Sequence, residues 1–169
     1  MGESDGRSDA HWAFALAVYG QPGVPDACIA LQDRHGVDVN VMLVMLFANA
    51  VHGTAPRRDA IVRLDAVGRP IQETVVKPLR EVRRAMKGRD FGAATERVRG
   101  KVKASELAAE QLEQAAMAEV ICAWPKQDGP CTPETVVAVV TDYFSGSVHR
   151  LDDALVAPIA RAVYACRNG

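Results

Sequence analysis

A group of carboxylates in the stretch SELAAEQLEQ could carry chemistry if the chain is helical there. Glu106, Glu110 and Glu113 lie four and three residues apart, so all three project from one side of a helix. Helical bundles that bind two metal ions combine such carboxylates with a Glu-x-x-His pattern. The sequence holds no such pattern. We therefore expect no metal at this stripe, and we expect the glutamates to pair with basic side chains or to face solvent.

Basic residues are concentrated just before this stripe. Residues 77–103 hold ten of the twenty lysines and arginines against three acids, a net charge of +7, whereas residues 104–153 hold nine acids and two bases. Three explanations stay open: packing of the basic helix against the acidic one, an interface between subunits, and a groove for phosphate or nucleic acid. No aromatic residues alternate with the arginines as a stacking platform requires, so nucleic acid is not expected as a partner.

The two charged segments together give a candidate binding site. We expect a basic helix over 70–87 and an acidic helix over 104–120. The candidate ligand-binding residues on these helices are Arg80, Arg84, Glu106 and Glu110. Arginine presents a planar fork that fits carboxylates and phosphates. If the four side chains pair with one another they form an ion-pair network in a closed core, and otherwise they line a pocket for an anionic small molecule.

A second group of polar residues interrupts the stretch LQDRHGVDVN. The group consists of Asp33, Arg34, His35, Asp38 and Asn40. A tight turn explains most of it, because Gly36 can end one helix, Asp38 can cap the next, and Asn40 can hydrogen-bond locally. Asp33 has no role in such a turn, and an ideal helix places it about 200° away from His35. We therefore keep Asp33 as a candidate ligand-binding residue.

The elements that must position these residues are predicted to be helical. Apolar residues recur at helical spacing, and aromatic residues make up only 5% of the chain. We predict an all-α, single-domain bundle of about seven to eight helices around a buried apolar helix at about 39–52. The helical domain is expected over 9–169, after a flexible tail at 1–8. Pro78 should kink or interrupt the basic helix, and Pro133 should begin a helix in the run ETVVAVV.

Composition and motifs point away from several classes of protein. The net charge is −1, and the longest apolar run, residues 39–51, is shorter than the roughly 20 residues that a membrane helix needs. The first residues lack a secretory signal, and the four cysteines form no C-x-x-C pair. No nucleophile, phosphate-loop or dinucleotide motif occurs. We expect a cytoplasmic protein with no cofactor, no metal and no membrane partner.

The N-terminal part of the chain also carries an ordered motif. Its form is W-x-F-x-L-x-x-Y, then PGV, then LQDxxGxDVN, and its residues are Trp12, Phe14, Leu16, Tyr19, Pro22, Gly23, Val24, Cys28, Leu31, Gln32, Asp33, Gly36, Asp38, Val39 and Asn40. The PLR at 78–80 and the later glutamate pair extend the pattern to about Met117. The chain resembles an uncharacterised bacterial domain-of-unknown-function family of small helical cytosolic proteins. The resemblance implies an all-helical protein with no established activity.

Two hypotheses for the function follow. The first, which we favour, is a non-catalytic cytosolic accessory or binding protein whose charged helices are structural or contact a protein partner. That partner could be a second copy of the chain in a homodimer. The alternative is a protein that binds or transforms an anionic small molecule, in a pocket between the basic helix 70–87 and the acidic helix 104–120.

Overall fold

The computed structural model describes residues 10–124, 131–147 and 151–168, and within these ranges all regular structure is helical. The helices are α2 (Ala10–Tyr19), α3 (Val24–His35), α4 (Val39–His52), α5 (Arg58–Ile71), η1 (Gln72–Val76), α6 (Lys77–Ala85), α7 (Thr95–Cys122), α8 (Pro133–Ser145) and α9 (Asp153–Asn168). The predicted all-α, single-domain bundle is confirmed. The predicted tail at 1–8 lies outside the described residues.

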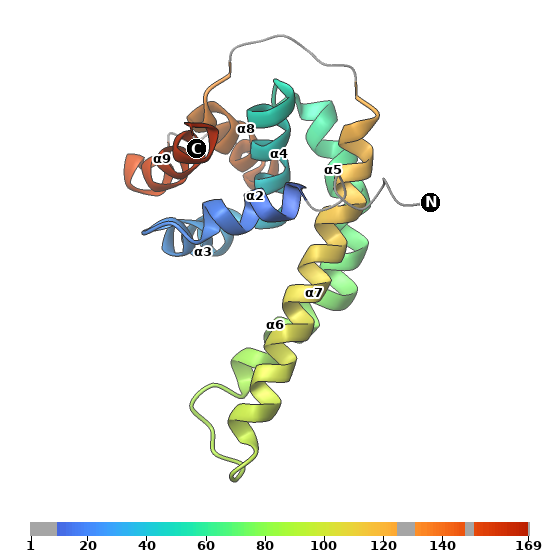
Figure 1. Ribbon diagram of the computed structural model, residues 1–169, viewed down its shortest axis with the longest axis vertical. Helices are drawn as coiled ribbons and strands as arrows, with labels where there is room; N and C mark the ends of the chain where they lie inside the picture. The colour runs from blue at the N-terminus through green and yellow to red at the C-terminus, as the bar shows by residue number, and fades with distance from the viewer. Residues whose placement is uncertain (1–9, 125–130, 148–150, 169) are drawn as a thin grey trace.

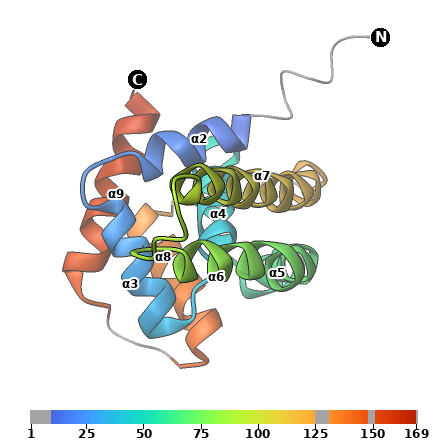
Figure 2. The same ribbon diagram turned by 90° about the horizontal axis from the view of Figure 1, so that it is seen from below.

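The helices form a head and a projecting arm (Figure 1). The head contains α2, α3, α4, α8 and α9, together with α5 and the C-terminal half of α7. The arm comprises residues 77–105, which are α6, the connecting turn and the N-terminal half of α7. Seen from below, the α5–α6 segment and α7 run side by side, with α3 and α9 to one side of them (Figure 2).

The apolar helix α4 lies at the centre of the head. Asp38 caps it by accepting hydrogen bonds from the backbone N–H groups of Asn40 (2.9 Å) and Val41 (3.3 Å). Residues 40–49 are all buried, because α4 packs against α2, α3, α5, α7, α8 and α9. The predicted buried helix at 39–52 is therefore confirmed. Among the described residues, none of the helices has the length and apolar character that a membrane span requires.

The segment from α5 to α6 differs from the prediction. The basic helix expected over 70–87 does not begin at Pro70, which lies inside α5, and η1 and α6 follow without a break. Pro78 has no N–H to offer to the preceding turn, and the backbone widens into a π-helical turn just before it. The chain therefore stays helical through the prolines. Within the π-helical turn, Gln72 is buried.

Two glycines within helices differ in the space around them: Gly68 lies where α5 packs against α7, and Gly100 lies in an open part of α7. A Cβ at Gly68 would lie 3.1 Å from Sδ of Met117 and 3.2 Å from Oε1 of Glu113, whereas a Cβ at Gly100 would meet no described atom within 4 Å. We expect Gly68→Ala to lower the free energy of unfolding by about 1–2 kcal/mol through overpacking. Gly100→Ala should raise it by about 0.5–1 kcal/mol, because alanine favours a helix. Urea denaturation measures both changes, and two changes of the same sign would contradict this packing.

Candidate functional site

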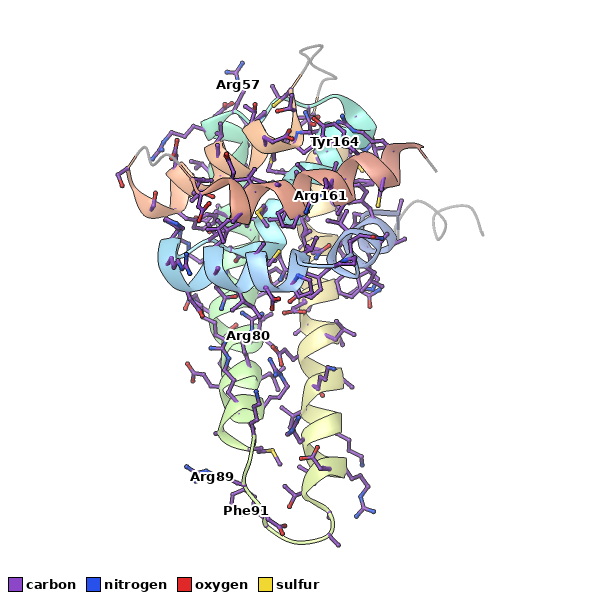
Figure 3. All side chains as sticks on the ribbon, turned by 90° about the vertical axis from the view of Figure 1, so that its left-hand side faces the viewer. Arg57, Arg80, Arg89, Phe91, Arg161 and Tyr164 are labelled. Atoms are coloured by element: carbon purple, nitrogen blue, oxygen red, sulfur yellow. The ribbon has the colours of Figure 1, made fainter. Side chains whose placement is uncertain are left out.

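A cavity of about 400 Å³ lies where the arm meets the head. Its lining residues are Trp12, Ala15, Leu16, Tyr19, Cys28, Ile29, Gln32, Val39, Asn40, Leu43, Gln72, Arg80, Arg83, Arg84, Lys103, Glu106, Leu107, Glu110 and Gln114. They come from α2, α3, α4, η1, α6 and α7. Figure 3 shows Arg80 of α6 directly below the head, at the base of the arm. The volume is typical of a site for a small molecule.

Most of the apolar side of the cavity comes from the head. Four large apolar residues that line it are between 37% and 48% exposed, namely Leu16, Tyr19, Ile29 and Leu107. Single exposed apolar residues are ordinary on a protein surface, whereas several that gather in one concavity mark a binding surface. An apolar group bound there would remove these side chains from water.

The arm supplies the ionic side of the cavity together with α7. The guanidinium of Arg80 donates to Oε1 of Glu106 (3.0 Å), to Oε1 of Glu110 (2.6 Å) and to Oε1 of Gln32 (2.8 Å). Arg83 donates to both carboxylate oxygens of Glu106. The expected pairing of the basic helix with the acidic helix is therefore present, and Arg80 also ties the arm to α3.

Two further cations line the cavity outside this network. Arg84 and Lys103 are exposed, and neither forms an ion pair within the described part of the chain. Burial raises the pKa of Glu110. Burial also acts to raise the pKa of Glu106, but the hydrogen bonds from two arginines outweigh burial and lower it. The cavity thus holds four cationic side chains against two carboxyl groups, so it favours an anionic ligand.

A buried polar network forms the inner end of the cavity. The Nδ2 of Asn40 donates to Oε2 of Glu113 (2.8 Å), and Nε2 of Gln114 donates to Oδ1 of Asn40 (2.8 Å). The Nε2 of Gln72 donates to Oδ2 of Asp38 (3.0 Å). These bonds join the start of α4 to η1 and α7. The prediction that Asn40 would bond locally through its side chain is wrong, because its amide reaches across to α7.

The carboxyl groups of this network are poorly placed to carry charge. Burial raises the pKa of Asp38, although the backbone N–H groups of Val41 and Asn40 oppose the shift. Burial, together with the nearby Asp38, raises the pKa of Glu113 to about 9. Glu113 is therefore protonated at neutral pH and lies in the core as a neutral group. The expectation that Glu113 would pair with a basic side chain or face solvent is wrong, since it is fully buried.

Two buried carbonyl oxygens in the network have no donor. The Oε1 atoms of Gln72 and Gln114 lack a hydrogen-bond partner among the described residues. Both residues line the cavity, and their amide nitrogens already donate to Asp38 and Asn40. A buried acceptor without a donor costs about 1–3 kcal/mol. A ligand with an N–H or O–H group at this end of the cavity would remove that cost.

The cavity is better suited to recognition than to nucleophilic chemistry. Burial raises the pKa of Cys28 to about 12, so its thiol stays protonated at neutral pH and is a weak nucleophile. Burial also raises the pKa of Tyr19, so its phenol keeps its proton. These side chains offer apolar contact and hydrogen bonding to a ligand.

The structure brings four of the five predicted binding residues to one cavity. Arg80, Glu106 and Glu110 form the ion-pair network, and Arg84 lines the cavity beside it. Asp33 is exposed on α3 and does not line the cavity. Its carboxylate forms no ion pair within the described residues.

The inner end and the apolar side of the cavity were not predicted from the sequence. Gln72 and Gln114 showed no pattern in the sequence, and Asn40 was assigned to a turn. Leu16 and Tyr19 were named only as members of the ordered motif. The ordered motif contains Leu16, Tyr19 and Asn40, together with Gln32, and membership of that motif was the signal that could have pointed to these cavity residues.

Comparison with known proteins places the chain in a family. A family model described as protein of unknown function (DUF2390) matches residues 10–117. The match covers more than half of the chain, so the chain belongs to this family, and the predicted resemblance to a domain-of-unknown-function family is confirmed. No curated protein and no solved structure matches the chain. Every residue that lines the cavity falls within the matched region.

Proposed function

We propose that this member of the DUF2390 family binds a small amphipathic anion in the cavity at the base of the arm. The observation that carries the proposal is the division of one concave surface into an apolar side and a cationic side. Leu16, Tyr19 and Ile29 would contact the apolar body of the ligand. Arg84 and Lys103 would contact its anionic group, because their charges are not used by an ion pair among the described residues.

The existing ion pairs determine which cations the ligand meets. Arg80 already has three partners, and removing it from Glu106 and Glu110 would leave two carboxylates facing each other. Arg84 can bind an anion without leaving a carboxylate, because it forms no ion pair among the described residues. We infer that the anion binds to Arg84 and Lys103, while Arg80 and Arg83 hold the shape of the cavity. The orphan oxygens of the inner end favour a ligand that also carries a hydrogen-bond donor.

A matched set of probes tests this proposal by thermal shift and calorimetry. Octanoate and phenyl phosphate each combine an apolar body with an anionic group, octan-1-ol and phenol supply the body alone, and inorganic phosphate supplies the anion alone. We expect only the combined probes to raise the melting temperature. A probe at about 100 times its Kd should add about 2.7 kcal/mol to the free energy of unfolding.

Substitutions at the cavity locate the binding. The double variant Arg84→Ala/Lys103→Ala should weaken binding of octanoate and phenyl phosphate by about tenfold or more, with little change in the melting temperature without ligand. Lys101→Ala is the matched control, since Lys101 is an exposed arm cation that does not line the cavity. Equal binding by the neutral probes, or unchanged binding by the double variant, would contradict the proposal.

We also propose a cytoplasmic location and a non-catalytic role for this binding. The free state of all four cysteines is in keeping with a reducing compartment. The protonated thiol of Cys28 is in keeping with recognition rather than nucleophilic catalysis.

A further inference from the structure

The tip of the arm carries a cationic and apolar patch. Figure 3 shows Arg89 and Phe91 at the end of the arm that lies farthest from the head. Phe91 is 69% exposed, and Lys87 and Arg89 are exposed on the same turn. Neither cation forms an ion pair within the part of the chain that the structure describes. A large aromatic ring in water at the end of an arm favours a contact that covers it.

The lower face of the head carries the complementary pattern. Asp26, Ile29 and Asp33 lie three and four residues apart on α3, so they form one stripe of that helix. All three side chains are exposed, and the aspartates form no ion pair among the described residues. The α3 stripe therefore has an apolar residue between two acids, whereas the arm tip has an aromatic residue beside two cations.

The two patches cannot meet within one chain. Arg80 contacts Gln32 of α3 at 2.8 Å, and Lys87 follows Arg80 by seven residues. Seven residues of helix span about 10 Å along the arm, away from the head. The views in Figures 1 and 3 agree that α3 forms the side of the head that faces along the arm, well above the tip. A contact between the patches therefore requires two chains.

The charge of the whole chain favours the same arrangement. Residues 77–103 carry a net charge of +7, with ten basic and three acidic residues. The whole chain has a net charge of −1, so the rest of the chain carries −8. A molecule with a basic arm and an acidic remainder attracts the arm of a second copy to its head.

We propose that the protein forms a two-fold symmetric dimer in which the arm tip of each copy docks on the α3 stripe of the other. Lys87 and Arg89 pair with Asp26 and Asp33, and Phe91 covers Ile29. The two contacts are identical, so the assembly closes at two copies rather than growing into a filament. This dimer gives Asp33 a partner and does not require a ligand in the cavity. Because Ile29 also lines the cavity, the docked Phe91 would cover part of its apolar side, and a cavity ligand would compete with the dimer for Ile29.

The arm fits a second copy better than it fits a nucleic acid. A single aromatic residue, Phe91, occurs in residues 77–103, whereas a nucleic-acid platform stacks several bases in succession. Glu81, Asp90 and Glu96 in the same segment would repel a polyanion. The α3 stripe of a second copy offers one apolar residue for Phe91 and two charges opposite to those of the arm tip.

Sedimentation velocity of the full chain tests the dimer. The wild-type chain should associate in about 0.1 M salt and dissociate in about 1 M salt, where the Debye length falls from about 10 Å to about 3 Å. The tip variant Lys87→Glu/Arg89→Glu and the stripe variant Asp26→Lys/Asp33→Lys should each raise the dimer Kd by about tenfold or more. Arg63→Glu/Arg161→Glu, which changes two exposed head cations outside both patches, should leave the Kd unchanged.

An equimolar mixture of the tip and stripe variants provides the decisive measurement. In the mixed dimer the reversed tip of one copy meets the reversed stripe of the other, and the second contact is wild type on both sides. Association should therefore return to the wild-type level. Circular dichroism of each variant verifies that it is folded before mixing. A wild-type chain that stays monomeric in low salt, or variants that do not recover on mixing, would overturn the proposal. A monomer that instead binds heparin or RNA through Lys87 and Arg89 would also overturn it, and would assign the arm to a polyanion.

Discussion

Replacing Arg80 by alanine is expected to lower the free energy of unfolding by about 2–4 kcal/mol. The side chain is only 16% exposed, and it bonds Glu106, Glu110 and Gln32 at once. Without it, Glu110 loses its cation at a half-buried position, and the arm loses its bond to α3. Urea denaturation of the variant measures the change directly.

Arg84→Ala is the matched control for this prediction. Arg84 lies one turn further along α6, is exposed and has no ion pair among the described residues, so its removal should change the free energy of unfolding by less than about 0.5 kcal/mol. Adding an anion such as phosphate should not restore the stability of Arg80→Ala, because the missing group is a cation. Equal effects of the two substitutions would show that the ion-pair network does not hold the arm to the head.

The stability of the protein is expected to fall as the pH rises from about 6 to about 8, because Glu113 keeps its proton in the folded protein. Its pKa is about 9 in the folded protein and 4.5 in the unfolded chain. Between these values the folded state keeps a proton that the unfolded state has released, so a higher pH favours unfolding, by at most about 1.4 kcal/mol per pH unit. We expect a loss of about 1–3 kcal/mol over this range.

Glu113→Gln separates this effect from those of other groups. Glutamine keeps the shape of the protonated acid and cannot ionise, so the variant should exceed wild type in stability at about pH 6 and by a larger margin at about pH 8. Asp38 and Glu110, whose pKa values are also raised, would leave a slope of the same sign. Glu119→Gln, at an exposed position of the same helix, should leave the wild-type slope unchanged. A Glu113→Gln variant with the full wild-type slope would show that Glu113 is ionised in the folded protein.

The position of the helix caps and the central helix followed from local sequence. Gly36 ends α3 in the left-handed conformation at φ 69°, and Asp38 caps α4, as the turn chemistry predicted. The run at 39–52 predicted a buried helix because almost all its side chains are apolar. These features depend on residues within one or two turns of each other, so a single sequence contains the information that specifies them.

The cavity and the arm were decided by tertiary structure. In the sequence, Arg80 and Arg84 are equivalent candidates, since both lie on the same basic helix. The structure separates them, because the rotation of α6 relative to α7 and α3 turns Arg80 toward three partners and leaves Arg84 in solvent. That rotation depends on the π-helical turn of η1 and on packing against distant segments, which local periodicity does not encode.

The sequence by itself determined that the protein is an all-α bundle around α4, and that a basic segment precedes an acidic one. Tertiary structure alone decided that Asn40 and Glu113 form a buried pair, that the apolar residues of α2 complete a cavity, and that Asp33 lies exposed in the α3 stripe. The physical reason is the range of the interactions. Helix formation and capping are settled within a few neighbouring residues, whereas Asn40 and Glu113 are 73 residues apart and meet only when α4 and α7 pack.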